Sequence, residues 1–108
     1  MYTTQMISEL FGGIDENVGV IIPVHSPEFV KVAPSKQYED RNVLDIDDVK
    51  KRINCEYFEI VRIPNSDYIL VADEEGLFNN PMVNIVASRL VGVPIVGDVM
   101  LCHTSLVA

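Results

Sequence analysis

Three consecutive acids after an apolar run are the densest group of chemically capable side chains in this sequence. Asp73, Glu74 and Glu75 follow "YILVA" and precede Gly76. Carboxylate oxygens suit hard cations, but calcium loops place their acids at alternating positions. Consecutive acids at a turn usually point in different directions, and a glycine there supplies a permissive backbone conformation. We therefore expect a solvated bend at Asp73–Glu75 rather than a metal site.

Two cysteines and two histidines are the other candidates for catalysis or metal binding. Cys102 and His103 are adjacent, and neighbours on a strand project to opposite faces, so we expect no thiol–imidazole pair. Cys55 and Cys102 lack metal-ligand spacing and stand beside apolar residues, which predicts buried free thiols in a reducing compartment; one disulfide is the alternative. A tetrahedral zinc site would need both cysteines and both histidines, or help from carboxylates. The sequence predicts no catalytic residue, metal or cofactor, and an enzyme built on His25 and His103 is a minor alternative.

Four other polar residues could bind a ligand. Glu59 and Arg62 are three apart on an expected strand, so they face opposite sides and cannot pair with each other. Asn80 followed by Pro81 is typical of a helix start, with Asn80 as the N-cap and Asn84 inside the helix. Helix N-termini bind anions through free N–H groups. Capping and cross-strand contacts explain these residues, and a small anion or nucleotide bound by Glu59, Arg62, Asn80 and Asn84 is the functional alternative.

The charge balance narrows the range of partners. Sixteen acidic residues against eight basic ones give a net charge of −8, and the one basic cluster, Lys50–Arg52, has acids on both sides. Direct binding to nucleic acid is therefore not expected, because neutralising phosphates needs clustered Lys and Arg. The excess of acidic residues indicates either a contribution to solubility or binding to a basic surface of a partner protein. The sequence shows neither a secretory signal nor an apolar stretch of membrane-spanning length, so we expect a cytoplasmic protein without membrane contact.

The pattern of apolar residues predicts one α+β domain. The order of elements is β-β-α-β-β-α-β, which gives a mixed or mainly antiparallel sheet of about five strands covered by two helices. The domain spans 18–108 and follows an N-terminal arm or short helix over 1–17. The last strand is apolar on both faces and should lie centrally in the sheet. The expected strands are 18–24, 28–33, 56–63, 68–72 and 94–102, the expected helices are 45–53 and 82–91, and 34–43 is expected to be an irregular loop.

The helix over 45–53 has the clearest local signals. Asp45 can cap its N-terminus, acids follow in the first turn, and Lys50–Arg52 stand near its negative end. In the second helix Met82, Ile85, Val86 and Leu90 are expected to form one buried stripe, and Gly92 is expected to end it.

A longer pattern resembles a known family. The run "YFEIVRIPNSDYILVADEEGLFNNPMVN", followed after a helix by "IVGDVMLC", is similar to domain-of-unknown-function family 3846, whose members occur mainly in bacteria, phages and mobile elements. The resemblance covers 18–102 and includes "VIIPVHSPEFVKV", Glu59–Arg62, Glu74–Gly76, Asn84 and Gly97. It departs from the family pattern at "NNPM" and "CEY". The resemblance implies a phage-type accessory role and supplies no catalytic residues.

These observations favour a non-enzymatic, small acidic interaction protein, an accessory factor of a phage or mobile element that acts on a host protein. The first alternative is an oligomer that binds or sequesters a nucleotide or another small anion, in which the C-terminal strand and the tail "TSLVA" form a subunit contact. The second alternative is a small enzyme that uses His25 and His103 or the Asp73–Glu75 turn.

Overall fold

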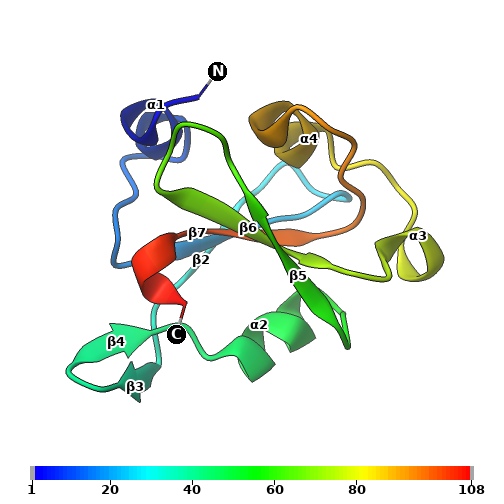
Figure 1. Cartoon of the computed structure of the whole chain (residues 1–108). Coiled ribbons are helices and arrows are strands. Elements are labelled where there is room, and N and C mark those ends of the chain that lie inside the picture. Colours follow the sequence, from blue (N-terminus) through cyan, green and yellow to red (C-terminus); the bar gives the residue numbers. More distant parts are fainter. Residues whose placement is uncertain (1, 108) are drawn as a thin grey trace.

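A five-stranded antiparallel sheet forms the centre of the molecule. The computed structural model describes residues 2–107 (Figure 1). The strand order is β2-β1-β7-β6-β5, and every neighbouring pair is antiparallel. The predicted α+β class with about five strands is therefore confirmed. The strands are β1 (Gly19–Ile22), β2 (Val30–Val32), β5 (Phe58–Arg62), β6 (Tyr68–Asp73) and β7 (Val99–His103).

Helices cover both faces of this sheet. α1 and α4 pack on one face, while α2 and η1 pack on the other (Figure 1). The order of the predicted elements is confirmed, and α1 is the short helix expected as one form of the N-terminal segment; α3, η1 and a small hairpin are additions. None of the helices in residues 2–107 is long and apolar enough to cross a membrane. The helices are α1 (Thr4–Leu10), α2 (Ile46–Arg52), α3 (Gly76–Asn79), α4 (Ile85–Val91) and the 3₁₀ helix η1 (Thr104–Leu106).

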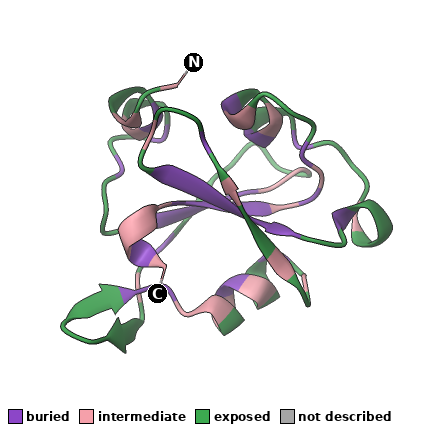
Figure 2. Ribbon diagram, viewed as in Figure 1, coloured by how far each residue is buried: buried purple, intermediate pink, exposed green. Residues whose placement is uncertain are grey.

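The neighbouring strands β6 and β7 are buried on both faces, as Figure 2 shows. In β6 Leu70 belongs to the core beneath α1 and α4, while Val71 belongs to the core above α2. Leu101 and Met100 alternate in the same way in β7. Each such side chain contributes about 1.5–3 kcal/mol when fully buried. The prediction that the last strand lies centrally is confirmed, and the helices on both faces explain its unbroken apolar run.

The helix α2 begins and ends where its sequence signals predict. The Asp45 side chain accepts a hydrogen bond from the backbone N–H of Asp47 at 3.0 Å. At the other end Asn54 has a φ of 56°, and the Cys55 N–H donates to the carbonyl oxygen of Lys50 at 2.9 Å. A left-handed residue followed by this bond is the Schellman arrangement, which satisfies carbonyl groups left free at a helix end.

The second predicted helix begins three residues later than expected, at Ile85. Asn84 is its N-cap and lies outside the helix, whereas Asn80 caps the C-terminus of α3 and starts no helix. The intervening chain is extended because Val83 forms a bridge with Val96, and the Gly97 N–H donates to the carbonyl oxygen of Met82 at 2.9 Å. This pairing outweighs the Asn-Pro signal. The predicted end is confirmed: Gly92 is the C-cap, with a φ of 82°.

The segment 34–43 forms a β-hairpin, not the irregular loop that its polarity predicts. β3 (Lys36–Tyr38) pairs with β4 (Arg41–Val43) around a tight turn in which Glu39 has a φ of 56°. Almost all its side chains are exposed, so no apolar alternation marks it as a strand pair. The hairpin is joined to η1 by a hydrogen bond from the Leu44 N–H to the Leu106 carbonyl oxygen at 2.8 Å.

Candidate functional site

The acidic turn is only partly the solvated bend that its sequence predicts. Glu74 and Glu75 are exposed, but Asp73 is buried. Its carboxylate accepts hydrogen bonds from the backbone N–H of Glu75 and from Nδ2 of Asn79, both at 2.9 Å. Asp73 thus connects the two ends of α3, and both oxygens of its carboxylate accept hydrogen bonds within the fold. Across residues 2–107 no three metal-ligating side chains gather at one point.

The two histidines lie at opposite ends of β7. Ile22 pairs with Val99 at the start of this strand, and His25 lies beyond Ile22, whereas His103 ends the strand. Four residues of a strand span about 13 Å. The Nδ1 atom of His103 is 2.9 Å from the Ser105 hydroxyl and accepts the Ser105 N–H at 3.2 Å. The structure therefore does not bring the imidazoles together.

Cys102 and His103 face opposite sides of the sheet, as predicted. Cys102 lies in the core above α2, while the His103 ring meets the edge of the Tyr68 ring, which belongs to the other core. Both cysteines are free; Cys102 is buried and Cys55 is half-buried. Burial raises the pKa of Cys102 to about 12. A thiol that stays protonated near neutral pH is a poor nucleophile.

The four predicted ligand-binding residues do not form one cluster, since Asn80 and Asn84 both adjoin Gly97 whereas Glu59 and Arg62 lie on β5. Asn84 is only 2% exposed. Its Nδ2 donates to the carbonyl oxygens of Ile22 and Gly97, both at 2.9 Å. Its Oδ1 accepts a hydrogen bond from the backbone N–H of Ala87 in α4. Glu59 and Arg62 are exposed on the edge strand β5. Asn80 is half-buried at the end of α3. Anion binding by these residues stays a prediction, and the internal hydrogen bonds of Asn84 already account for its polar atoms.

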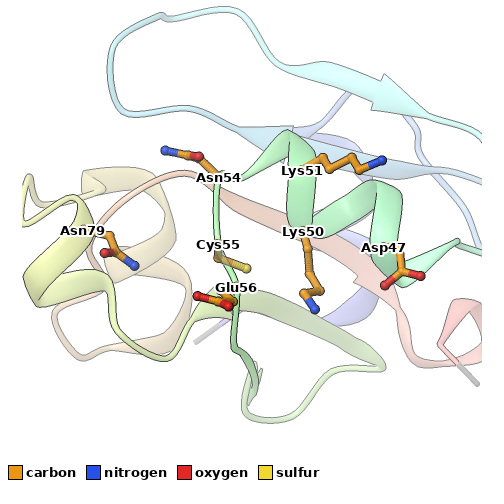
Figure 3. A pocket seen from close by; sticks show the side chains of 7 residues that line it. All are labelled: Asp47, Lys50, Lys51, Asn54, Cys55, Glu56 and Asn79. Carbon is orange, nitrogen blue, oxygen red and sulfur yellow. The ribbon is translucent and has the colours of Figure 1, made fainter.

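A polar groove of about 750 Å³ lies between α2 and α3 (Figure 3). Asn79 lines it from α3, and Asp47, Lys50 and Lys51 line it from α2, with Asn54, Cys55 and Glu56 between them. Its two acids balance its two lysines. Burial, followed by the nearby Asp73 carboxylate, raises the pKa of the Cys55 thiol, although Lys50 acts in the opposite direction. The groove offers hydrogen bonds and contains no activated nucleophile within the described chain.

The most unusual surface of the molecule is apolar and lies over α3, α4 and the segment before β7. Phe78 is 88% exposed, Leu77 76% and Ile85 65%. Large apolar side chains that are this exposed gain nothing from the monomer's own core. Figure 2 shows α3 largely exposed and α4 with an exposed outer side. We call the following residues the apolar band: Leu77, Val83, Ile85, Val86, Val93 and Pro94.

Three adjoining depressions make the apolar band continuous. The first, about 280 Å³, lies between Leu77 and Pro94. The second, about 430 Å³, shares Pro94 with the first and continues past Val93 to Val83 and Ile85. The third, about 390 Å³, shares Val83 and Ile85 with the second and reaches the loop after β1. A ligand that is long enough to span the three depressions can therefore contact all of them.

Charge is distributed unevenly along this band. Glu59 and Glu74 line the depression at the Leu77 end, beside the buried Asp73. Arg89 lines the middle depression and is the one basic residue that follows Arg62 in the sequence, against five acids in the same stretch. One end of the band thus combines exposed apolar surface with carboxylates.

The apolar band was not expected from the sequence. Met82, Ile85 and Val86 are expected in a buried stripe with Leu90, but all three are exposed and the helix buries Ala87 and Leu90 instead. Met82 lies before the helix and so cannot belong to its stripe, and within the helix Ala87 and Leu90, three residues apart, form the buried face. The adjacent pair "LF" directly after an acidic turn is the one signal that pointed to exposed apolar side chains.

No protein-family model, curated protein or solved structure matches this chain. Function is therefore inferred from the arrangement of its own residues. The polar groove and the apolar band are two candidate sites on the surface, and the apolar band consists of exposed apolar side chains that do not contribute to the core.

Proposed function

We propose that this chain is a non-enzymatic binding protein whose apolar band docks a basic amphipathic segment of a partner protein. The observation that carries the proposal is the strong exposure of Leu77, Ile85 and Val93 along three adjoining depressions. Contiguous apolar patches on soluble monomers usually mark interaction sites. Amphipathic helices are recognised in such grooves through apolar side chains at helical spacing.

The acidic residues define the chemistry of the partner. Glu59 and Glu74 line the Leu77 end, and the whole chain has a net charge of −8. Lys or Arg residues that flank the apolar anchors of a partner would meet these carboxylates. Complementary charge of this kind raises the association rate and makes it sensitive to salt.

A second copy of this chain fits the apolar band less well than a basic partner. A two-fold contact places the same surface on both sides, so residues of one copy meet those of the other in pairs. The acids at the Leu77 end outnumber the single Arg89, so two copies would bring an excess of carboxylates together. Repulsion between them opposes a symmetric dimer through this face.

The resemblance to family 3846 motivates a narrower form of the proposal. In that form the chain is a cytoplasmic accessory factor of a phage or mobile element, and the basic segment belongs to a host protein. The resemblance rests on sequence patterns such as Glu59–Arg62 and Glu74–Gly76. The net charge and the apolar band are compatible with this role.

A designed peptide tests the docking directly. The probe is a fluorescent helix of about 14 residues, four turns, with leucines at positions i, i+3, i+4 and i+7 and lysines elsewhere. We expect binding that weakens as salt is added, and weakening of about tenfold or more by Ile85→Asp, which is the size of an ordinary hot-spot loss. Fluorescence anisotropy measures both effects.

The matched control is Leu10→Asp, because Leu10 is also more than half exposed but lies on α1, outside the apolar band. A peptide with glutamates in place of lysines should bind much more weakly. Equal binding by the Ile85→Asp and Leu10→Asp variants would refute the site. A dimer in sedimentation that Ile85→Asp dissociates would assign the apolar band to self-association instead.

A further inference from the structure

A separate apolar cavity lies on the other side of the sheet, beneath the β3–β4 hairpin. Its volume is about 340 Å³, and its floor includes Val49 and Val71, each 1% exposed. Ile46 and Phe58 are half-buried at its side, and Lys36 and Tyr38 are exposed at its mouth. The other lining residues are Val43, Leu44, Leu106 and Val107.

The cavity is too large to be a packing defect. Protein interiors contain few voids larger than one water molecule. Because one water occupies about 30 Å³ of liquid, this space matches on the order of ten non-hydrogen atoms. It is also within the range of natural small-molecule sites, which begin at roughly 300 Å³ and are lined mainly by apolar side chains.

The hairpin roof is held in place from the side of η1. The Arg41 guanidinium donates to the Ser105 carbonyl oxygen at 3.1 Å and lies 5.6 Å from the centre of the Tyr38 ring. The Leu44 N–H donates to the Leu106 carbonyl oxygen at 2.8 Å. These contacts join the hairpin to η1 and to the segment after β4 at the side of the cavity.

Lys36 is the one charged residue among those that line the cavity. The salt bridge among residues 2–107 joins Arg52 and Asp48, so no Asp or Glu carboxylate of these residues lies within 4 Å of the Lys36 amino group. A ligand with an apolar body and one carboxylate would satisfy both the cavity and this ammonium group. The neighbouring Tyr38 hydroxyl can donate a second hydrogen bond to the same carboxylate.

We infer that the cavity beneath the β3–β4 hairpin binds a small apolar carboxylic acid, with its hydrocarbon part against Ile46, Phe58 and Val107 and its carboxylate at Lys36. This site is distinct from the apolar band, which lies on α3 and α4. The chain would then have a ligand site on one side of the sheet and a protein-docking surface on the other.

Octanoic acid is a suitable probe because it has ten non-hydrogen atoms, which matches the estimate of about ten. Titration followed by amide NMR shifts should move signals of the residues that line the cavity. Lys36→Met retains most of the alkyl chain but removes the charge, and we expect it to weaken binding about tenfold. Lys31→Met is the matched control, since Lys31 is an exposed lysine on β2 that does not line the cavity.

Two neutral or cationic analogues complete the experiment. Octan-1-ol should bind the unaltered chain more weakly than octanoate does. It should bind the Lys36→Met variant as well as it binds the unaltered chain. Octylamine should bind the unaltered chain most weakly of the three. Val107→Phe, at a half-buried wall position, should fill part of the cavity and reduce binding of all three. The inference is overturned if octanoate shifts map elsewhere, if Lys36→Met and Lys31→Met bind octanoate equally, or if no probe binds at millimolar concentration.

Discussion

The side-chain amide of Asn84 donates a hydrogen bond at 2.9 Å to the carbonyl oxygen of Ile22, which lies 62 residues earlier in the chain. The same Nδ2 atom donates to Gly97, and Oδ1 accepts the N–H of Ala87 in the first turn of α4. One buried side chain therefore joins the end of β1, the segment before β7 and the start of a helix. It fixes the position of α4, and with it the exposed face of the apolar band.

Replacing Asn84 should be among the most destabilising polar substitutions in this chain. Asn84→Ala removes an N-cap, which costs about 1 kcal/mol, and leaves two buried carbonyl oxygens with fewer partners, at about 1–3 kcal/mol each. We expect the free energy of unfolding to fall by about 3 kcal/mol or more in urea denaturation. Asn80→Ala is the control, because no side-chain hydrogen bond of Asn80 occurs within the described chain, and its effect should be within about 0.5 kcal/mol.

Gly92 offers a test of backbone conformation alone. Its φ is 82°, and a Cβ atom built there would have no heavy atom within 4 Å. Gly92→Ala should therefore lower the free energy of unfolding by about 1–2 kcal/mol through the left-handed conformation and not through a clash. Gly92→Asn should cost less, since asparagine tolerates this region better. Equal losses for both variants in thermal or urea denaturation would contradict this explanation.

The buried Cys102 thiol predicts a loss of stability at alkaline pH. Below pH 9 both the folded and the unfolded states retain the proton, because the ordinary thiol pKa is 9.0 and burial raises the pKa of Cys102 to about 12. Above pH 9 the unfolded state releases the proton while the folded state keeps it, so the free energy of unfolding falls with rising pH up to about pH 12. The contribution of this residue has a limiting slope of about 1.4 kcal/mol per pH unit.

Cys102→Val is the matched variant because it retains an apolar side chain in the core and removes the titrating group. Its unfolding free energy should decline less steeply between pH 9 and pH 11 than that of the unaltered chain. Part of the slope should persist, since burial also raises the pKa of Tyr68. An unchanged slope in denaturation series across this pH range would show that Cys102 does not contribute.

Signals that depend on a few neighbouring residues predicted this structure well. The Asp45 cap and the Lys50–Arg52 end of α2 are local, and so is the alternation that separates Cys102 from His103. The burial of the last strand on both faces was also visible as a continuous apolar run. In each case the sequence signal and the feature that it predicts lie within one helix or strand, so the prediction did not depend on tertiary contacts.

Features that depend on pairing between distant segments were missed. Asn80 and Pro81 have the composition of a helix start, but the bridge between Val83 and Val96 keeps that stretch extended. The 34–43 hairpin is exposed and polar, so nothing in its apolar pattern marks it. The apolar band was missed for a related reason. The sequence shows that Ile85 is apolar, but its exposure depends on how the elements pack against one another.

Arg41 provides the last prediction, because it alone among the hairpin side chains contacts both the ring of Tyr38 and the backbone of Ser105 within the described residues. Arg41→Ala should release the hairpin locally, at a cost of about 1 kcal/mol for the lost cation–π contact and hydrogen bond. Amide hydrogen exchange of Leu44, whose N–H is bonded to Leu106, should then become about fivefold faster.

The free energy of global unfolding should fall by no more than the same amount, about 1 kcal/mol, because Arg41 makes these contacts only in the folded state. Arg62→Ala, which removes an exposed arginine from the edge strand β5, should leave exchange at Leu44 unaltered. Octanoate should protect this amide in the unaltered chain if it occupies the cavity below. If Arg41→Ala leaves the exchange rate of Leu44 unchanged, the hairpin is held by other contacts.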